Sequence, residues 1–308
     1  MTEIQKSIIK TLTYFSIFKH PLKIDELHRY LLFQRCAIDD LKKEANELKD
    51  IGKIFEIENF YLIENDKNWI LNRYHGEKLA SKFWKIAQLM AHLMKRFPFV
   101  RGIFISGSLA KWNVTIHTDI DFFIITKPRR LWMTRSALIA FKKIFLFNSK
   151  KFFCLNYFIT DDHLEIEDKN IFTAIEIASI KPIFNFDLYL KFLEANSWIK
   201  NFVPNFVPAQ LPNLISKRFP VSKLILEKLV EISFNKNTSS LDDFDLFLMN
   251  KWEKIWQKRY PHLTNEERDL MFRCRPYVSK AHPNNFQNFV LTNYEEKLKI
   301  FLNDSAHS

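Results

Sequence analysis

Apolar residues recur every three or four positions in three stretches of the first fifty residues, and this spacing predicts amphipathic helices. The predicted helices cover residues 4–15, 24–32 and 37–50. Gly52 suits the left-handed residue that ends the third helix. Two short apolar runs follow, at residues 53–57 and 60–63, and are expected to pair as strands.

Three helices followed by two paired strands resemble a winged helix-turn-helix domain. Such domains commonly bind DNA through their third helix, but here residues 37–50 carry five acidic side chains against three lysines. Neutralisation of phosphate supplies most non-specific DNA affinity, so an acidic recognition helix argues against DNA binding. We expect this domain to dock a protein or another part of its own chain.

The middle of the chain alternates between the two kinds of pattern. A helix is predicted over residues 72–96, then a strand ending at Ser106, a tight turn with a short helix, and a strand up to Ile125. A helix over residues 129–147 and a strand over 152–159 complete this part. The chain after residue 161 is mostly helical in pattern.

These elements predict a mixed α/β (α+β) fold, in which a small mixed sheet is flanked by helices. A chain of 308 residues is long enough for about two domains, and its 47% apolar residues can fill their cores. We divide the chain into a winged-helix domain at residues 1–65, a core at 66–168 and a helical C-terminal region at 169–308.

The formal net charge of +11 is concentrated in one segment. Residues 65–160 hold 17 Lys and Arg against 4 Asp and Glu, a net of +13, whereas the segments before and after it each have a net of −1. This segment would attract a polyanion such as a nucleoside triphosphate or nucleic acid. The alternative is a lysine-rich solvated face.

No apolar run reaches the length of a membrane span, and residues 1–10 lack the pattern of a secretion signal. We therefore expect a cytoplasmic protein without a membrane partner. The three cysteines are far apart in sequence, which favours free thiols. HExxH, GxSxG, P-loop and GxGxxG patterns are all absent from the sequence, so the corresponding protease, hydrolase, ATPase and dinucleotide-binding classes lack support.

The candidate chemistry lies between the two central strands. Gly107 and Ser108 follow an apolar strand, where a glycine permits close approach of the backbone to a phosphate. Asp119 and Asp121 are one residue apart, so on a strand both carboxylates share a face while Ile120 turns into the core. Two such carboxylates repel each other unless a divalent cation lies between them. The alternative is an Asp-x-Asp at a surface strand end.

One sequence pattern joins these residues: Gly-Ser, then ten residues, then Asp-hydrophobic-Asp. This pattern and its surroundings, about 60 residues in all, resemble the signature of the DNA polymerase beta-like nucleotidyltransferase superfamily. The resemblance implies that Gly107 and Ser108 bind nucleotide phosphates, and that Asp119 and Asp121 hold two magnesium ions, for which manganese could substitute. Lys111 stands where many members have a basic residue and could contact phosphate. Trp112 departs from the pattern, because a second glycine is frequent there.

The third carboxylate of the family is the larger departure. The strand expected to carry it contains none, and Asn156 occupies the corresponding position. An amide coordinates metal weakly and cannot act as a base. Either a later carboxylate reaches the site, or substrate or water replaces the base, or the enzyme is impaired. The later carboxylates are Asp161, Asp162, Glu165 and Glu167.

Two functions follow from these residues. The first is a magnesium-dependent transferase that moves a nucleoside monophosphate from a triphosphate to a hydroxyl acceptor on a protein, an RNA or a small molecule, and releases pyrophosphate. The second is a catalytically weak or inactive nucleotide-binding regulator, whose winged helix docks a protein partner or DNA. Asn156 is the feature that favours the second.

Overall fold

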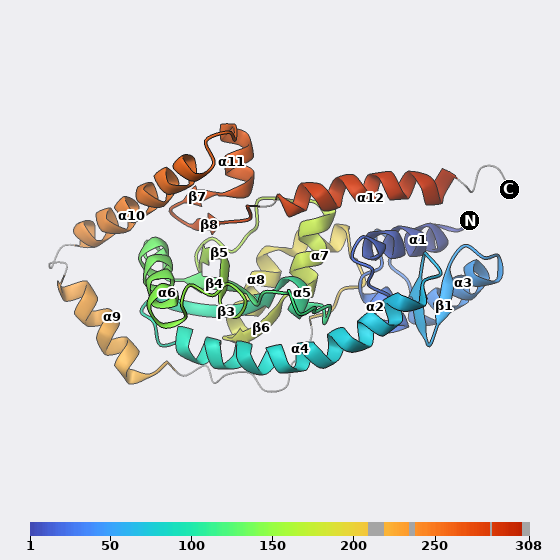
Figure 1. Ribbon diagram of the computed structural model, residues 1–308, viewed down its shortest axis with the longest axis horizontal. Coiled ribbons are helices and arrows are strands. Elements are labelled where there is room, and N and C mark those ends of the chain that lie inside the picture. The colour runs from blue at the N-terminus through green and yellow to red at the C-terminus, as the bar shows by residue number, and fades with distance from the viewer. Residues whose placement is uncertain (209–218, 234–237, 284, 304–308) are drawn as a thin grey trace.

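The computed structural model describes residues 1–208, 219–233, 238–283 and 285–303. It has the expected mixed α+β class, with a six-stranded sheet flanked by helices and a separate two-stranded sheet (Figure 1). The N-terminal elements match the predicted order of three helices and a hairpin. They are α1 (Glu3–Ser16), α2 (Ile24–Arg29), α3 (Ile38–Asp50), β1 (Phe55–Ile57) and β2 (Phe60–Leu62).

The central helix α4 (Lys67–Met94) begins five residues before the predicted start, because Asp66 caps it by accepting from the Asn68 N–H. Its 28 residues make it about 42 Å long. It runs along the core and reaches the N-terminal domain (Figure 1). The core elements that follow are β3 (Val100–Ser106), α5 (Gly107–Ala110), β4 (Asp121–Thr126), α6 (Leu131–Phe145) and β5 (Cys154–Thr160).

The C-terminal region is mostly helical, but it also contributes three short strands. Its helices are α7 (Ile171–Ser179), α8 (Phe186–Ala195), the 3-10 turn η1 (Ser197–Asn201), α9 (Val221–Ser233), α10 (Thr238–Arg259), α11 (Asn265–Met271) and α12 (Phe286–Asn303). Its strands are β6 (Lys181–Phe184), β7 (Cys274–Arg275) and β8 (Val278–Lys280). The six strands lie in the order β6-β3-β4-β5-β8-β7, so residues after 168 form both edges of the sheet.

Among the paired strands of the large sheet, only β4 and β5 run parallel. Their common direction determines which side chains of β5 lie near the candidate site. Asp121 is opposite Cys154 at one end, and Thr126 is opposite Thr160 at the other. β3 runs antiparallel to β4, so that Ser106 pairs with Asp121. The C-terminal end of β3 and the N-terminal ends of β4 and β5 therefore lie side by side, at one end of these three central strands.

The two faces of the sheet are buried under different helices. Ile103, Ile105 and Phe122 pack in one apolar cluster with residues of α4 and α6. Phe104 and Phe123, which alternate with them, pack in a second cluster with α7, α8 and α12. The second cluster also contains the buried residues of α1 to α3, so the N-terminal domain shares its core with this face of the sheet. None of the helices in the described part of the chain has the length and apolar character of a membrane span.

Arg73 of α4 ties the N-terminal domain to the core. Its side chain is 2% exposed and contacts Glu26 at 2.5 Å, Glu77 at 3.0 Å and the ring of His20. The guanidinium also lies over the ring of Phe60. A buried cation needs such partners, because burial without them is strongly unfavourable.

Replacing this arginine is expected to loosen the join between α2 and α4. We predict that Arg73→Ala lowers the free energy of unfolding by about 3 kcal/mol, because Glu26 loses its cation and Glu77 keeps only its contact with Lys23 at 3.6 Å. Chemical denaturation measures this loss. Lys6→Ala, which removes the cation of the exposed Lys6–Glu3 pair, is the control and should leave stability unchanged within error. Equal effects of the two variants would contradict this role for Arg73.

Candidate functional site

The turn after β3 brings its backbone against a carboxylate. Gly107 has a φ of +65°, a conformation that side chains rarely adopt. A Cβ atom placed on it would lie 2.6 Å from Oδ2 of Asp121. A glycine is therefore required here on two grounds, backbone conformation and space. Ser108 follows at the partly exposed start of α5.

The two aspartates flank the beginning of β4. The strand begins at Asp121, so Asp119 lies in the preceding loop and not on the strand as expected. Ile120 between them is fully buried, as predicted. Its N–H donates to the Lys151 carbonyl at 2.8 Å, and its carbonyl accepts from the Cys154 N–H at 3.1 Å. These two bonds fix the backbone between the carboxylates.

Asn156 contacts Asp121 from the neighbouring strand. Its Nδ2 donates to Oδ1 of Asp121 at 2.8 Å, and its Oδ1 accepts from the Cys154 thiol at 3.2 Å. Asn156 thus occupies the position beside the aspartates that the sequence assigned to it. The amide holds one oxygen of Asp121, while the other oxygen faces Gly107.

The electrostatics of the pair favour a cation. Burial raises the pKa of Asp121 to about 7, and the negative charges of Asp119 and Glu176 raise it further. A hydrogen bond involving Cys154 and the positive charge of Lys111 act in the opposite direction. Positive charge supplied between the carboxylates would stabilise the ionised form.

The four later carboxylates do not pair with the residues at the start of β4 and β5. Asp161 and Asp162 follow the last residue of β5, about 20 Å from its start. Glu165 pairs with Lys169. Glu167 pairs with Arg273 and Arg275. Asp161 and Asp162 therefore lie at the opposite end of β5, and Glu165 and Glu167 are paired with cations other than Lys111. Of the three alternatives that the sequence left open, these contacts do not favour completion of the site by a later carboxylate.

Glu176 of α7 is the carboxylate that the sequence reasoning missed. Its Oε1 lies 2.5 Å from Nζ of Lys111, and its charge acts on Asp121. The Lys111 Nζ also lies 3.4 Å from the Gly107 carbonyl, which places the ion pair beside the glycine turn. One signal in the sequence could have found it: Glu176 is the only charged residue in the otherwise apolar and hydroxyl-bearing helix Ile171–Ser179.

The N-terminal domain reaches the same place. Tyr14 of α1 is fully buried, and burial and the charge of Glu176 raise its pKa. Its ring packs against Tyr294 of α12 at 5.8 Å. Asn113, in the turn after α5, donates to the Phe18 carbonyl at 3.4 Å. The N-terminal domain therefore contacts the turn after α5, and its Tyr14 is within electrostatic range of Glu176 on α7.

Trp112 has a φ of +57°, a left-handed conformation that favours glycine. The ring stacks on Trp84 at 6.5 Å and lies under Nζ of Lys181 at 5.2 Å. These contacts offset the strain of about 1 kcal/mol that such a backbone imposes. His117 lies exposed in the turn before Asp119, as expected for a turn residue.

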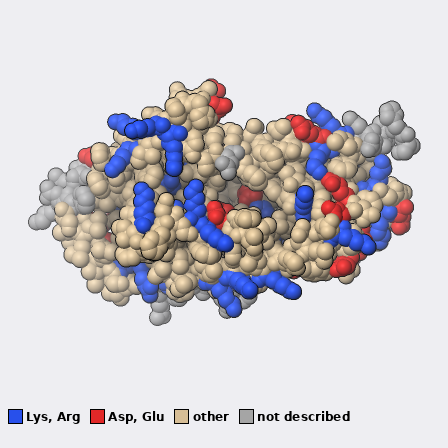
Figure 2. All heavy atoms as spheres, viewed as in Figure 1, with Lys and Arg blue, Asp and Glu red and all other residues tan. Residues whose placement is uncertain are grey.

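Figure 2 shows acidic atoms in a hollow of this face, between the positions of α5 and α7, with Lys and Arg side chains around it. Within the described part of the chain, no three His, Cys, Asp or Glu side chains are grouped closely enough to hold a metal ion together. The candidate ligands are thus the Asp119–Asp121 pair, and Glu176 lies outside direct ligand distance while it is bonded to Lys111.

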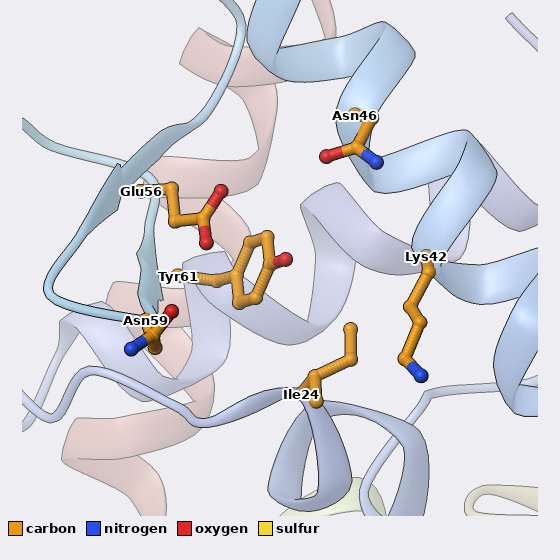
Figure 3. Close-up of a pocket in the computed structure, with 6 residues that line it drawn as sticks. All are labelled: Ile24, Lys42, Asn46, Glu56, Asn59 and Tyr61. Atoms are coloured by element: carbon orange, nitrogen blue, oxygen red, sulfur yellow. The ribbon is translucent and has the colours of Figure 1, made fainter.

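A separate pocket of about 290 Å³ lies in the N-terminal domain. Side chains from the β1–β2 hairpin, α2 and α3 point towards it (Figure 3). Its lining residues are Ile24, Lys42, Asn46, Glu56, Asn59 and Tyr61. It contains none of the candidate residues, and its mixture of one lysine and one glutamate favours no particular charge.

Comparison of the chain with protein-family models, curated proteins and solved structures finds no match. The functional argument therefore depends on the geometry of the site.

Gly107 and Gly52 provide a matched pair for testing the contact with Asp121. Both have positive φ, but a Cβ at Gly52 would meet nothing within 4 Å. We predict that Gly52→Ala destabilises the protein by about 1 kcal/mol through backbone strain alone, and that Gly107→Ala destabilises it more. Denaturation measures both losses. Equal losses would show that Asp121 does not press on the glycine backbone.

Proposed function

We propose that this protein is a magnesium-dependent nucleotidyltransferase. The observation that carries the proposal is the close contact between the Gly107 turn and Asp121 at the start of β4, with Asp119 two residues away. Oxygen of an acceptor hydroxyl would attack the α-phosphorus of a nucleoside triphosphate. The bond to the bridging oxygen would break, and pyrophosphate would leave.

The donor set fits magnesium, since the ion prefers carboxylate oxygens together with substrate phosphates. Asp119 and Asp121 would hold it, and the raised pKa of Asp121 is the response of a buried carboxyl whose neighbours are negative. When bound, the ion supplies positive charge to the phosphoryl group being transferred. Asn156 keeps Asp121 in place by its bond to Oδ1.

Lys111 and Glu176 have linked roles in this proposal. Lys111 is the nearest described cation to the glycine turn, and a triphosphate would compete with Glu176 for it. Glu176, once released, is the nearby carboxylate that can take the proton of the acceptor hydroxyl. It would thus replace the carboxylate that β5 lacks. Triphosphate binding and the availability of the base would be coupled through one ion pair.

A second candidate function is a nucleotide-binding regulator with little or no turnover. Asn156 beside Asp121 favours it, because that strand offers no base. The contacts of Tyr14 and Phe18 with the site give such a regulator a route from bound nucleotide to the N-terminal domain.

The carboxylate pair is tested by removing one charge. Asp121→Asn is expected to lower the rate of label transfer from the triphosphate to the acceptor at least about a hundredfold, because the charge that would hold the metal is lost. The assay uses each nucleoside triphosphate labelled at the α-phosphate, with magnesium and cell extract as the source of acceptor. Asp161→Asn, at the far end of β5, is the control and should retain full activity. Nucleotide binding by the wild type without any transfer would favour the regulator.

The linked roles of Lys111 and Glu176 predict different kinetic effects. Glu176→Gln should lower kcat about a hundredfold or more, because it removes a base, and should also lower KM for the triphosphate, because it frees Lys111 from its ion pair. Lys111→Gln should mainly raise KM. Glu165→Gln, a carboxylate away from the site, serves as control. A Glu176→Gln variant with normal kcat would exclude the proposed base.

A further inference from the structure

The turn between α6 and β5 carries an exposed patch that the proposed chemistry does not use. We call residues 142–151 the lysine–aromatic tip. It contains Lys142, Lys143, Phe145, Phe147, Lys150 and Lys151. Phe145 is 64% exposed and Phe147 is 93% exposed. Among the described residues, no carboxylate forms an ion pair with any of these four lysines.

The shape of the tip is built by hydrogen bonds. The Asn148 N–H donates to the Lys142 carbonyl at 3.0 Å, and the Ser149 N–H donates to the Leu146 carbonyl at 2.8 Å. Phe147 has a φ of +47°, which is strained for a residue with a bulky side chain. A large apolar ring held in water on a strained backbone contributes nothing to folding. Such a residue suggests a binding role.

The tip is joined directly to the segment between the two aspartates. Lys151 accepts the hydrogen bond of Ile120 described above, and Cys154 donates back to Ile120. Lys142 lies at the other end of the tip, within electrostatic range of Asp119. Burial lowers the pKa of Lys142, and the negative charge of Asp119 acts in the opposite direction. A molecule bound on the tip would therefore lie beside the carboxylates.

We propose that the lysine–aromatic tip binds a single-stranded nucleic acid, with its rings stacking on bases and its lysines contacting phosphates. The inference rests on the proposed transferase and names its acceptor class, a nucleic acid with a terminal hydroxyl. Lysines on both sides of exposed rings combine the two contacts that sequence-tolerant single-strand binding uses. Residues 122–160 contain no acidic side chain, so the segment that carries the tip has positive charge only.

A membrane surface would also accept lysines and apolar side chains, including the exposed Ile144. The position of the tip favours nucleic acid. The acceptor of the proposed transferase must reach this place beside Asp119, and the end of a nucleic acid strand can supply the acceptor hydroxyl.

Binding is measured by fluorescence anisotropy of a short labelled single-stranded RNA, without triphosphate or divalent ion, over a range of salt concentrations. Lys150→Gln/Lys151→Gln should weaken binding and reduce the slope of log affinity against log salt by about 1.4, since each phosphate contact contributes about 0.7. Lys42→Gln/Lys43→Gln on α3 removes the same charge and should change neither quantity.

The stacking contact is tested separately. Phe147→Ala should weaken RNA binding about fivefold or more, and Phe147→Trp should restore it, because stacking on a ring is lost and then regained. Phe247→Ala on α10 removes another exposed ring, 58% exposed, and should leave binding unchanged. Circular dichroism of each variant verifies its fold.

Absence of RNA binding by the wild type, or tip variants that bind as well as the wild type, would overturn the proposal. So would co-sedimentation with phosphatidylserine vesicles that depends on Phe147 while RNA binding does not. The Asp119→Asn/Asp121→Asn variant keeps the outcomes separate. It should bind RNA at least as well as the wild type, so failure of the transferase and failure of the tip give different results.

Discussion

The close approach of the Gly107 backbone to the Asp121 carboxylate is the contact on which the candidate site depends. It exists because β3 ends where β4 begins, and because residue 107 has no side chain to hold the two strands' ends apart. Asn156 secures the other oxygen of the same carboxylate from the parallel strand β5. Asp121 is thus held on both sides, partly buried, next to Asp119. A group placed in this way has its geometry fixed before any ligand arrives, which is what electrostatic catalysis requires.

The ion pair of Lys111 and Glu176 is a second interaction beside the glycine turn. The two charges satisfy each other, and neither is left unpaired in a partly buried place. The pair lies where α7 contacts α12 and α5, and Glu176 is within electrostatic range of Tyr14 on α1. Under the proposed function, nucleotide binding at this pair would therefore be coupled to the N-terminal domain. This arrangement accommodates both proposed functions, since a transferase could be regulated through the contacts that a regulator would use.

Local sequence patterns predicted the parts of the site that are close in the chain. The strand, turn and strand around Gly107 and Asp121 follow from apolar spacing and one glycine, and Asn156 was found by its place on the next strand. Glu176 could not be found in this way, because it joins the site through the packing of a helix 55 positions after Asp121. The sequence left open whether a later carboxylate reaches the site, because the direction of β5 relative to β4 is a tertiary property. The three short strands β6 to β8 were missed, since two to four residues carry too little periodicity to be recognised.

Divalent-ion binding by the aspartate pair is the central claim, and electron paramagnetic resonance of manganese tests it most directly. The protein is titrated with Mn²⁺ in the presence of a non-hydrolysable nucleoside triphosphate, and free ion is compared between the wild type and the Asp119→Asn/Asp121→Asn variant. The account predicts protein-dependent loss of the free-ion signal, beyond that caused by nucleotide alone, in the wild type and not in the variant. Equal loss of signal in both proteins would contradict it.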